Sequence, residues 1–502
     1  MLALSRRQNG VLVSYVYMIG QIVVQLAFVP LLLRVIGQTE YGLYQLIGSV
    51  MAYVVSINGV LSAGVGRFYC MYKANKDEEK MENCLAIAKR LYAAISLLCI
   101  IAIVALVLVV RFVYQAAFTA AQLNECSLML LIMGANMIVV MFNTLSVCTI
   151  TAYERFVFLK ISQLACLILQ LPLVCVFAQF FGNALMVCCV VFLTNSICAL
   201  IQVVYEKRVL KIKSTYHGWD SALAKSLLRF SASIVLVTLA DQIFWKCDQL
   251  IIGYFFGPNQ VAVYSVGSQI YGAYMSVGIA VASVFLPRVS EIFHHNHDFK
   301  ELSDLFINVG RISLLTCLAI LGAFVVLGDD FILLWAGEGF HNAYMIAVVV
   351  MLPFTIDIIQ NLGLTILQVI NKYYFRGAMY LCIAIANIFL TVILVNVIGI
   401  VGAALSTALS MLIGNGLIMN WYYSKIGLDI RRFWSSMLRI VIAAFVAIFI
   451  FCFIYSLRLD TTISFGQIII YACIYLLLYF VFEWAIALNS GEKKLIRNLI
   501  KL

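Results

Sequence analysis

The chain has 502 residues, of which 64% are hydrophobic and only 11% charged, and its mean hydropathy is +1.04. Soluble domains carry about 25% charged residues, so this composition excludes a set of water-soluble domains. A membrane-spanning helix needs about 20 mainly apolar residues, and we therefore predict an all-α, polytopic membrane protein.

Apolar runs along the chain predict fourteen membrane-spanning helices with short connections. The first run is too long for the apolar core of a signal peptide, so we expect a retained first helix. In chain order, the predicted spans are residues 11–33, 41–64, 91–112, 127–151, 161–181, 184–205, 230–253, 261–286, 312–334, 343–368, 378–398, 401–423, 440–457 and 467–488.

The basic residues are distributed unequally between the two sides of these spans. With the N-terminus inside, 29 of the 33 Lys and Arg residues fall on that side, and only Lys246 falls clearly within a span. This bias follows the positive-inside rule and predicts that both termini are cytoplasmic. The formal net charge of +10 is thus explained by membrane topology, and no nucleic-acid partner is expected.

A weak internal repeat relates the first six spans to the next six. At an offset of 220 residues, Gly37 matches Gly257 and Tyr44 matches Tyr264. The same offset places each of the first six spans on one of the next six, and each connection on a connection. Six spans per half is an even number, which predicts parallel repeats about an axis along the membrane normal. We therefore expect two six-helix bundles, residues 1–220 and 221–430, followed by two additional helices and a cytoplasmic tail in residues 431–502.

The span 230–253 carries three ionisable residues, Asp241, Lys246 and Asp248. The two aspartates are seven residues apart and share a helix face. Charges within a span are costly, at least about 2.5–3.5 kcal/mol each, so they should face water or each other. They form either a site for a coupling cation or an anionic headgroup, or a neutralised cluster that packs this helix.

Asp357, in the span 343–368, has Gln360 and Asn361 beside it at helical spacing. This group is either the second part of a cation site, for Na⁺ or H⁺, or a polar contact between helices.

Amide and arginine side chains offer candidates for binding a polar substrate. Gln21 and Gln25 share a face of the first span, and Asn136 and Asn143 share a face of the fourth; such amides suit a sugar-binding cavity or simply join helices. Arg34 and Arg67 lie near span ends, where they either extend to the membrane surface or bind a diphosphate through paired N–H donors.

Catalytic and metal-binding patterns are absent from the sequence. No histidine lies within a predicted span, and there is no phosphate-binding glycine loop with its lysine and no HExxH motif. We predict that the protein is not an enzyme and that it has no metal site and no organic cofactor.

Several short motifs are similar to those of the polysaccharide transporter branch, the O-antigen and capsule flippases, of the multidrug/oligosaccharidyl-lipid/polysaccharide exporter superfamily. They occur in the same order as in that family and sample nearly the whole chain. The motifs are LRVIGQTEYGLY at 33–44, GVGRF at 64–68, DQLIIGYFFG at 248–257, LPRVSE at 286–291, LWAGEGF at 334–340 and IGIVGAALST at 398–407.

The resemblance implies alternating access and a polyprenyl-diphosphate-linked oligosaccharide as substrate, moved between leaflets of a bacterial or archaeal cytoplasmic membrane. It also implies glycosyltransferases and a polysaccharide polymerase as pathway partners. In this sequence, Arg34, Arg67, Lys246, Gln21 and Gln25 are the candidate substrate-binding residues, and Asp241, Asp248 and Asp357 are the candidates for coupling to Na⁺ or H⁺. The main alternative is a multidrug/cation antiporter of the same superfamily.

One departure from the related peptidoglycan-precursor flippases bears on the substrate. Those proteins line their cavity with several arginines, whereas Lys246 is the only basic residue expected firmly within a span here. This difference counts against a peptidoglycan precursor.

Overall fold

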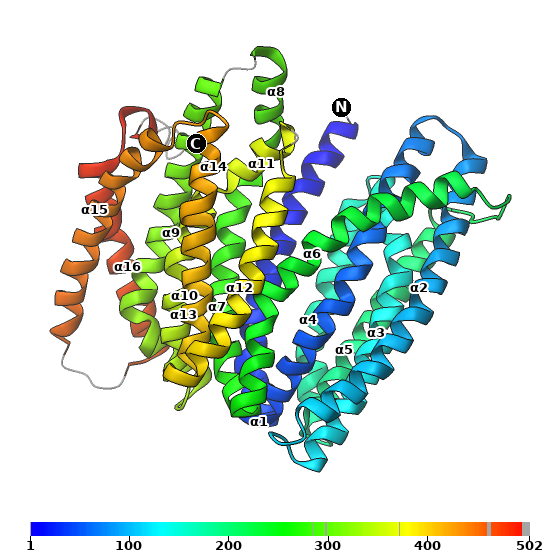
Figure 1. Cartoon of the computed structure of the whole chain (residues 1–502), viewed down its shortest axis with the longest axis horizontal. Coiled ribbons are helices and arrows are strands. Elements are labelled where there is room, and N and C mark those ends of the chain that lie inside the picture. Colours follow the sequence, from blue (N-terminus) through cyan, green and yellow to red (C-terminus); the bar gives the residue numbers. More distant parts are fainter. Residues whose placement is uncertain (1, 284, 297–298, 371, 459–462, 494–502) are drawn as a thin grey trace. The chain divides into compact units, whose positions relative to one another are not determined.

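The computed structural model describes residues 2–283, 285–296, 299–370, 372–458 and 463–493, which are almost entirely helical and contain no β-strand (Figure 1). Helices are expected because hydrocarbon offers no hydrogen-bond partner to an unpaired backbone N–H or C=O group. The chain divides into two compact units, Met1–Ala262 and Val263–Leu502. The predicted all-α class is confirmed.

Unit 1 consists of six helices and the first turn of a seventh. Helices α2 to α5 pack side by side, and both α1 and α6 contact this group (Figure 1). The bounds are α1 Leu2–Ala74, α2 Glu78–Val113, α3 Ala120–Ala152, α4 Phe156–Ala178, α5 Ala184–Arg208 and α6 Ser221–Phe256, with α7 beginning at Pro258.

The first two predicted spans form a single long helix, α1, with a sharp bend in place of the expected loop. The bend occurs at Gly37, whose backbone has φ 79° and ψ 173°. Essentially only glycine adopts this conformation. Because one residue makes the turn, Arg34 lies in helical backbone rather than in a connecting loop.

Gly37 and Gly257 provide structural support for the 220-residue repeat. Gly257, at the end of α6, has φ 76° and ψ −177°, nearly the same unusual conformation as Gly37. The next turns of the two segments also meet: the Thr39 hydroxyl donates to Asn259 Oδ1 at 2.6 Å, and these two residues are likewise 220 apart. The predicted bundle limits at residues 220 and 430 stay a prediction.

Unit 2 consists of the remainder of α7 and the helices that follow it. In this unit α9 packs against α10, α15 and α16, while α13 lies between α10 and α12. The bounds are α7 Pro258–Ser283, α8 Leu286–Asn296, α9 Phe299–Ala336, α10 His341–Ile359, α11 Asn361–Val369, α12 Tyr374–Ile398, α13 Ile400–Met411, η1 Leu412–Ile418, α14 Met419–Lys425, α15 Ile430–Ser456, α16 Phe465–Phe482 and η2 Glu483–Ala487, where η marks a π-helix.

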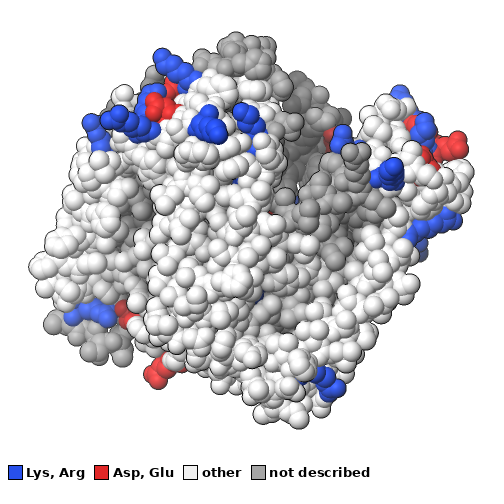
Figure 2. Space-filling view, viewed as in Figure 1, with Lys and Arg blue, Asp and Glu red and all other residues white. Residues whose placement is uncertain are grey.

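Eleven helical segments among the described residues are long and apolar enough to cross a membrane. On the face shown in Figure 2, Lys and Arg lie mostly toward one end of the helices of each unit and leave a largely uncharged band. The protein is therefore a multi-pass membrane protein. The number of spans, fourteen, and the cytoplasmic placement of both termini remain predictions, and the tail from residue 494 lies outside the described residues.

Two predicted spans are interrupted. The span 343–368 is broken at Gln360, where α10 ends and α11 begins, and the span 401–423 contains the π-helix η1. The side chains bridge these irregularities: Gln360 donates to Asn420 Oδ1 at 3.2 Å, and Asn420 donates to the carbonyls of Asn415 and Gly416. Side-chain amides thus satisfy backbone groups that an uninterrupted helix would pair itself.

Arg311 differs most from the sequence expectation, which placed it in a loop. Its side chain is 3% exposed within α9 and pairs with Glu492 through Nε at 2.7 Å and Nη2 at 2.9 Å. It also donates to the carbonyls of Ser436 and Ala487. Burial raises the pKa of Glu492, but hydrogen bonds from Arg311 and from the Asn489 N–H outweigh this and hold the pKa below its usual range.

We predict that Arg311→Leu lowers the thermal stability of the purified protein. Removing one partner of a buried ion pair leaves an uncompensated charge and costs about 3–5 kcal/mol. Arg432→Leu is the matched control, because Arg432 pairs with Asp304 at 2.5 Å with both side chains well exposed, where such pairs contribute about 0–1 kcal/mol. Equal melting temperatures for the two variants in neutral detergent would contradict this role.

Candidate functional site

Three neighbouring helices of unit 1 each present two amide side chains seven residues apart. These pairs are Asn136 and Asn143 on α3, Gln163 and Gln170 on α4, and Asn195 and Gln202 on α5. A spacing of seven residues places both members of a pair on one face of a helix, two turns apart. Since α3 and α4 both pack against α5, the three amide faces converge inside unit 1.

The amides form two layers of hydrogen bonds. In one layer, Asn143 Nδ2 donates to Gln202 Oε1 at 2.9 Å and Gln202 Nε2 donates to the Ser162 hydroxyl at 3.2 Å. In the other, Asn195 Nδ2 donates to Asn136 Oδ1 at 2.9 Å, and Gln170 Nε2 donates to the Thr194 hydroxyl at 3.1 Å. Polar groups at membrane depth must find such partners, because lipid offers none.

A cavity of about 370 Å³ lies among these helices. Its size falls in the usual range for small-molecule sites, roughly 300–1,000 Å³. The lining residues are Tyr17, Val140, Asn143, Thr144, Val147, Gln163, Cys166, Leu167, Gln170, Asn195, Cys198 and Gln202. None of these lining residues is acidic or basic.

Two further features give the cavity binding capacity. Asn143 Oδ1 is buried and receives no hydrogen bond from any described residue. Tyr17 contributes an aromatic ring from α1, and Lys160 Nζ lies 4.5 Å from the centre of that ring. An unsatisfied buried acceptor costs about 1–3 kcal/mol, so a ligand hydroxyl that donates to Asn143 would recover this energy.

The predicted substrate-binding residues of α1 lie outside this cavity. Gln21 is half-buried one turn beyond Tyr17, whereas Gln25 is exposed. Arg34 and Arg67 are also exposed, as expected of side chains near the ends of spans. Their proposed roles therefore stay predictions.

The charged residues of α6 have different environments. Asp248 is 2% exposed and Gln249 is also buried, because this part of α6 packs against α1, where Ser49 donates a hydrogen bond to Gln249. Tyr53 of α1 lies within electrostatic reach of Asp248. Asp241 and Lys246 are half-buried. Asp248 thus belongs to the α1–α6 contact, while Asp241 is more accessible.

In unit 2, Asp357 lies near an arginine that the sequence analysis had assigned to a loop. Arg376 belongs to the first turn of α12 and interacts electrostatically with Asp357 of α10. Its guanidinium donates to the Tyr373 hydroxyl at 2.9 Å and lies 5.3 Å from the ring centre of Tyr380. Arg376 Nε is buried and has no acceptor among the described residues.

Most residues of this site were not among the candidates predicted from the sequence. Of the cavity-lining amides, only Asn143 was singled out, although the same seven-residue rule applied to α4 and α5 would have found Gln163, Gln170, Asn195 and Gln202. Arg311 belongs to α9 and Arg376 to α12, so neither lies in the connection where the predicted spans place it. Among the described residues, no group of three or more His, Cys, Asp or Glu side chains that could hold a metal ion is found.

Comparisons with known proteins connect the chain to polysaccharide biosynthesis. The family model described as "Polysaccharide biosynthesis protein" matches residues 7–293, more than half of the chain. An O-antigen transporter of Shigella flexneri is 20% identical over 45% of this chain and 53% of its own length. A low-salt glycan biosynthesis flippase of Haloferax volcanii, Agl15, is 26% identical over 41% of this chain and 44% of its own length. The chain thus spans about half the length of these relatives, which are a transporter and a flippase rather than enzymes.

Solved structures show the fold over nearly the whole chain. The lipid II flippase MurJ, in an inward closed conformation, covers 98% of this chain and 99% of its own, with a TM-score of 0.74 and 15% identity. An inward-facing multidrug resistance MATE family transporter covers 82% and 95%, with a TM-score of 0.68 and 12% identity. The chain therefore belongs to the polysaccharide biosynthesis protein family and has the fold of the multidrug/oligosaccharidyl-lipid/polysaccharide exporter superfamily, as its sequence motifs predicted.

Proposed function

We propose that this protein is a flippase that moves polyprenyl-diphosphate-linked oligosaccharides from the inner to the outer leaflet of a bacterial or archaeal cytoplasmic membrane. The observation that carries the proposal is the amide-lined cavity of unit 1, which lies among membrane-spanning helices. Membership in a polysaccharide biosynthesis family supports the same conclusion. Glycosyltransferases that build the lipid-linked unit and a polymerase that consumes it would be the pathway partners.

The chemistry of the cavity suits a sugar. Each sugar hydroxyl both donates and accepts hydrogen bonds, and each amide side chain also does both. The cavity combines Asn143, Gln163 and Gln170 with the aromatic ring of Tyr17, so a sugar would find polar partners around its edge and an apolar surface for its ring face. Asn143 Oδ1 is buried and has no donor among the described residues, so a side-chain movement that exposes it would offer an acceptor to one hydroxyl.

The same cavity is a poor site for a cationic drug, which is the substrate class of the alternative antiporter. A cation desolvated at membrane depth needs a carboxylate to compensate its charge, and no residue that lines this cavity is acidic. We therefore favour the flippase, and the antiporter becomes the hypothesis to adopt if lipid-linked sugars are not moved.

The diphosphate of the substrate requires cationic donors outside the amide cavity. Arg34, Arg67 and Lys246 remain the proposed donors from the sequence, and the geometry of unit 2 adds Arg376, whose buried Nε lacks an acceptor among the described residues. Arginine suits this task because its fork of N–H groups matches phosphate oxygens.

We predict that Gln170→Leu slows flipping with little loss of protein. Leucine keeps most of the side-chain volume, and Thr194 retains its hydrogen bond to the Val190 carbonyl. Loss of one substrate hydrogen bond, about 1.4 kcal/mol, reduces the rate about tenfold. The measurement is the initial rate of translocation of a lipid-linked oligosaccharide in proteoliposomes.

Gln179→Leu is the matched control for that substitution, because Gln179 caps the same helix α4 but is exposed and does not line the cavity. Equal translocation rates for the two variants would show that the amide cavity does not bind the substrate during transport. Absence of translocation by the wild-type protein, together with loss of cation tolerance in cells lacking the protein, would favour the antiporter.

We also propose that Asp241, Asp248 and Asp357 couple transport to a Na⁺ or H⁺ gradient. Asp241→Asn or Asp357→Asn should make the flipping rate independent of an imposed gradient. The neutral amide has no negative charge to bind Na⁺, and it cannot take up and release a proton. Asp241 is half-buried whereas Asp248 is buried against α1, so Asp241→Asn should change coupling with the smaller loss of stability. A gradient dependence that is the same as in the wild type in all three Asn variants would exclude the coupling role.

A further inference from the structure

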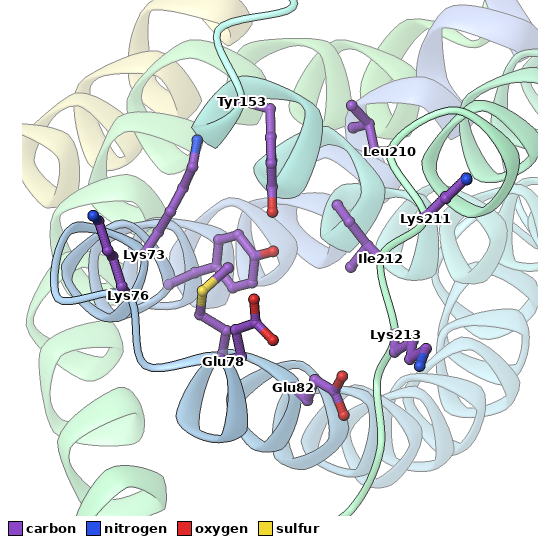
Figure 3. A pocket seen from close by; sticks show the side chains of 11 residues that line it. Lys73, Lys76, Glu78, Glu82, Tyr153, Leu210, Lys211, Ile212 and Lys213 are labelled. Carbon is purple, nitrogen blue, oxygen red and sulfur yellow. The ribbon is translucent and has the colours of Figure 1, made fainter.

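A second pocket lies at one end of unit 1, away from the amide cavity, where the chain connections meet (Figure 3). Its volume is about 450 Å³. It is formed by the end of α1, the start of α2, the α3–α4 connection and the segment after α5. The lining residues are Tyr69, Lys73, Lys76, Glu78, Met81, Glu82, Tyr153, Leu210, Lys211, Ile212 and Lys213.

The pocket gathers four lysines from two distant parts of the chain, Lys73 and Lys76 after the second predicted span and Lys211 and Lys213 after α5. Lys73 is fixed in place, since it donates to the Ala152 carbonyl and its Nζ lies 3.8 Å from the centre of the Tyr153 ring. The other three lysines are exposed. The pocket also has two acidic lining residues, Glu78 and Glu82, and Glu82 contacts His217 at 3.3 Å. Four lysines against two carboxylates leave the lining with a formal charge of +2.

The connection between α5 and α6, which carries Lys211 and Lys213, is held against α2 although it has no helical structure. Lys89 donates to the Ser214 hydroxyl at 2.6 Å, and the backbone N–H of His217 donates to Asn83 Oδ1 at 3.1 Å. The Arg90 guanidinium also stacks 3.2 Å from the centre of the Tyr216 ring. These contacts order the wall of the pocket before any ligand arrives.

Backbone strain is concentrated at the same place. Among the described residues, only three non-glycine residues have positive φ: Lys76 at 56°, Glu154 at 55° and Lys211 at 53°. Lys76 and Lys211 line the pocket, and Glu154 directly follows Tyr153, which also lines it. Side chains disfavour this conformation. At Lys76 and Glu154 it ends a helix, as the bonds from Asp77 N–H to the Tyr72 carbonyl and from Arg155 N–H to the Ile150 carbonyl show. Glycine would adopt this conformation with less strain. We therefore attribute the presence of lysine at positions 76 and 211 to the function of its side chain.

We propose that this pocket binds a phosphate-bearing ligand. Lysine ammonium groups are effective phosphate binders because each is a compact charge with three N–H donors. The rings of the two tyrosines and the side chains of Met81, Leu210 and Ile212 add apolar surface to the lining. The phosphate belongs either to an anionic phospholipid headgroup or to a soluble ligand such as a diphosphate, and both present the same chemistry to the lysines.

The test measures binding of two probes to the full-length, delipidated protein in neutral detergent. One probe is inorganic pyrophosphate and the other is a short-chain phosphatidylglycerol, with phosphatidylcholine of the same chain length as the uncharged comparison. Calorimetry gives the Kd of each. Binding of pyrophosphate alone identifies a soluble ligand, binding of phosphatidylglycerol alone identifies a lipid headgroup, and binding of both supports the shared phosphate chemistry.

Lys211→Gln/Lys213→Gln should weaken binding of the probe at least tenfold. Lys207→Gln/Lys225→Gln is the matched control, because it removes two exposed lysines on either side of the same connection that do not line the pocket; here we expect less than a twofold change. Lys211→Gly should weaken binding while keeping or raising the melting temperature, because glycine accepts the positive φ. That result separates loss of a ligand contact from unfolding.

Two results would overturn the proposal: a wild-type protein that binds neither probe, or pocket and control variants with the same Kd.

Discussion

The absence of hydrogen-bond partners in hydrocarbon is the constraint on which the rest of this structure depends. It requires helices, and it requires that polar side chains within them pair with one another. In unit 1 this pairing produces the layers of Asn143 with Gln202 and of Asn136 with Asn195. Among the residues that the structure describes, the pairing is incomplete at Asn143 Oδ1, beside a cavity, and that is where a polar ligand would be stabilised.

Glycine determines how the helices of unit 1 meet. Gly37 and Gly257 make the same one-residue turn, and a Cβ atom at Gly42 would overlap the carbonyl of Pro258. Close backbone approach at this point brings α1 against α6, where Ser49 contacts Gln249. The position of Asp248 follows from this packing, because the contact that buries Gln249 buries the adjacent carboxyl group as well. The motifs that indicated the family are therefore also the segments that set the geometry of this contact.

Hydropathy was sufficient to predict the helical segments, because each long apolar run can be stable only as a helix in a membrane. It could not predict the break at Gln360 or the π-helix after Met411, where Gln360 bonds to Asn420 and Asn420 bonds to the carbonyls of Asn415 and Gly416. The loop assignment of Arg311 and Arg376 failed for a related reason: a charge near the end of a span can be buried if a distant residue neutralises it. The spacing of Asn136 and Asn143 indicated one of the three amide-bearing helix faces. That the three faces meet around a cavity depends on how the helices pack, which the sequence pattern does not show. The lysine pocket also depends on contacts between distant connections.

The central claim is that this protein moves a lipid-linked oligosaccharide between leaflets. The most direct measurement is the leaflet distribution of polyprenyl-diphosphate-linked oligosaccharide in cells with and without the protein. A flippase predicts that loss of the protein traps the lipid-linked unit in the cytoplasmic leaflet and abolishes surface polysaccharide. An unchanged distribution between the leaflets would contradict the account.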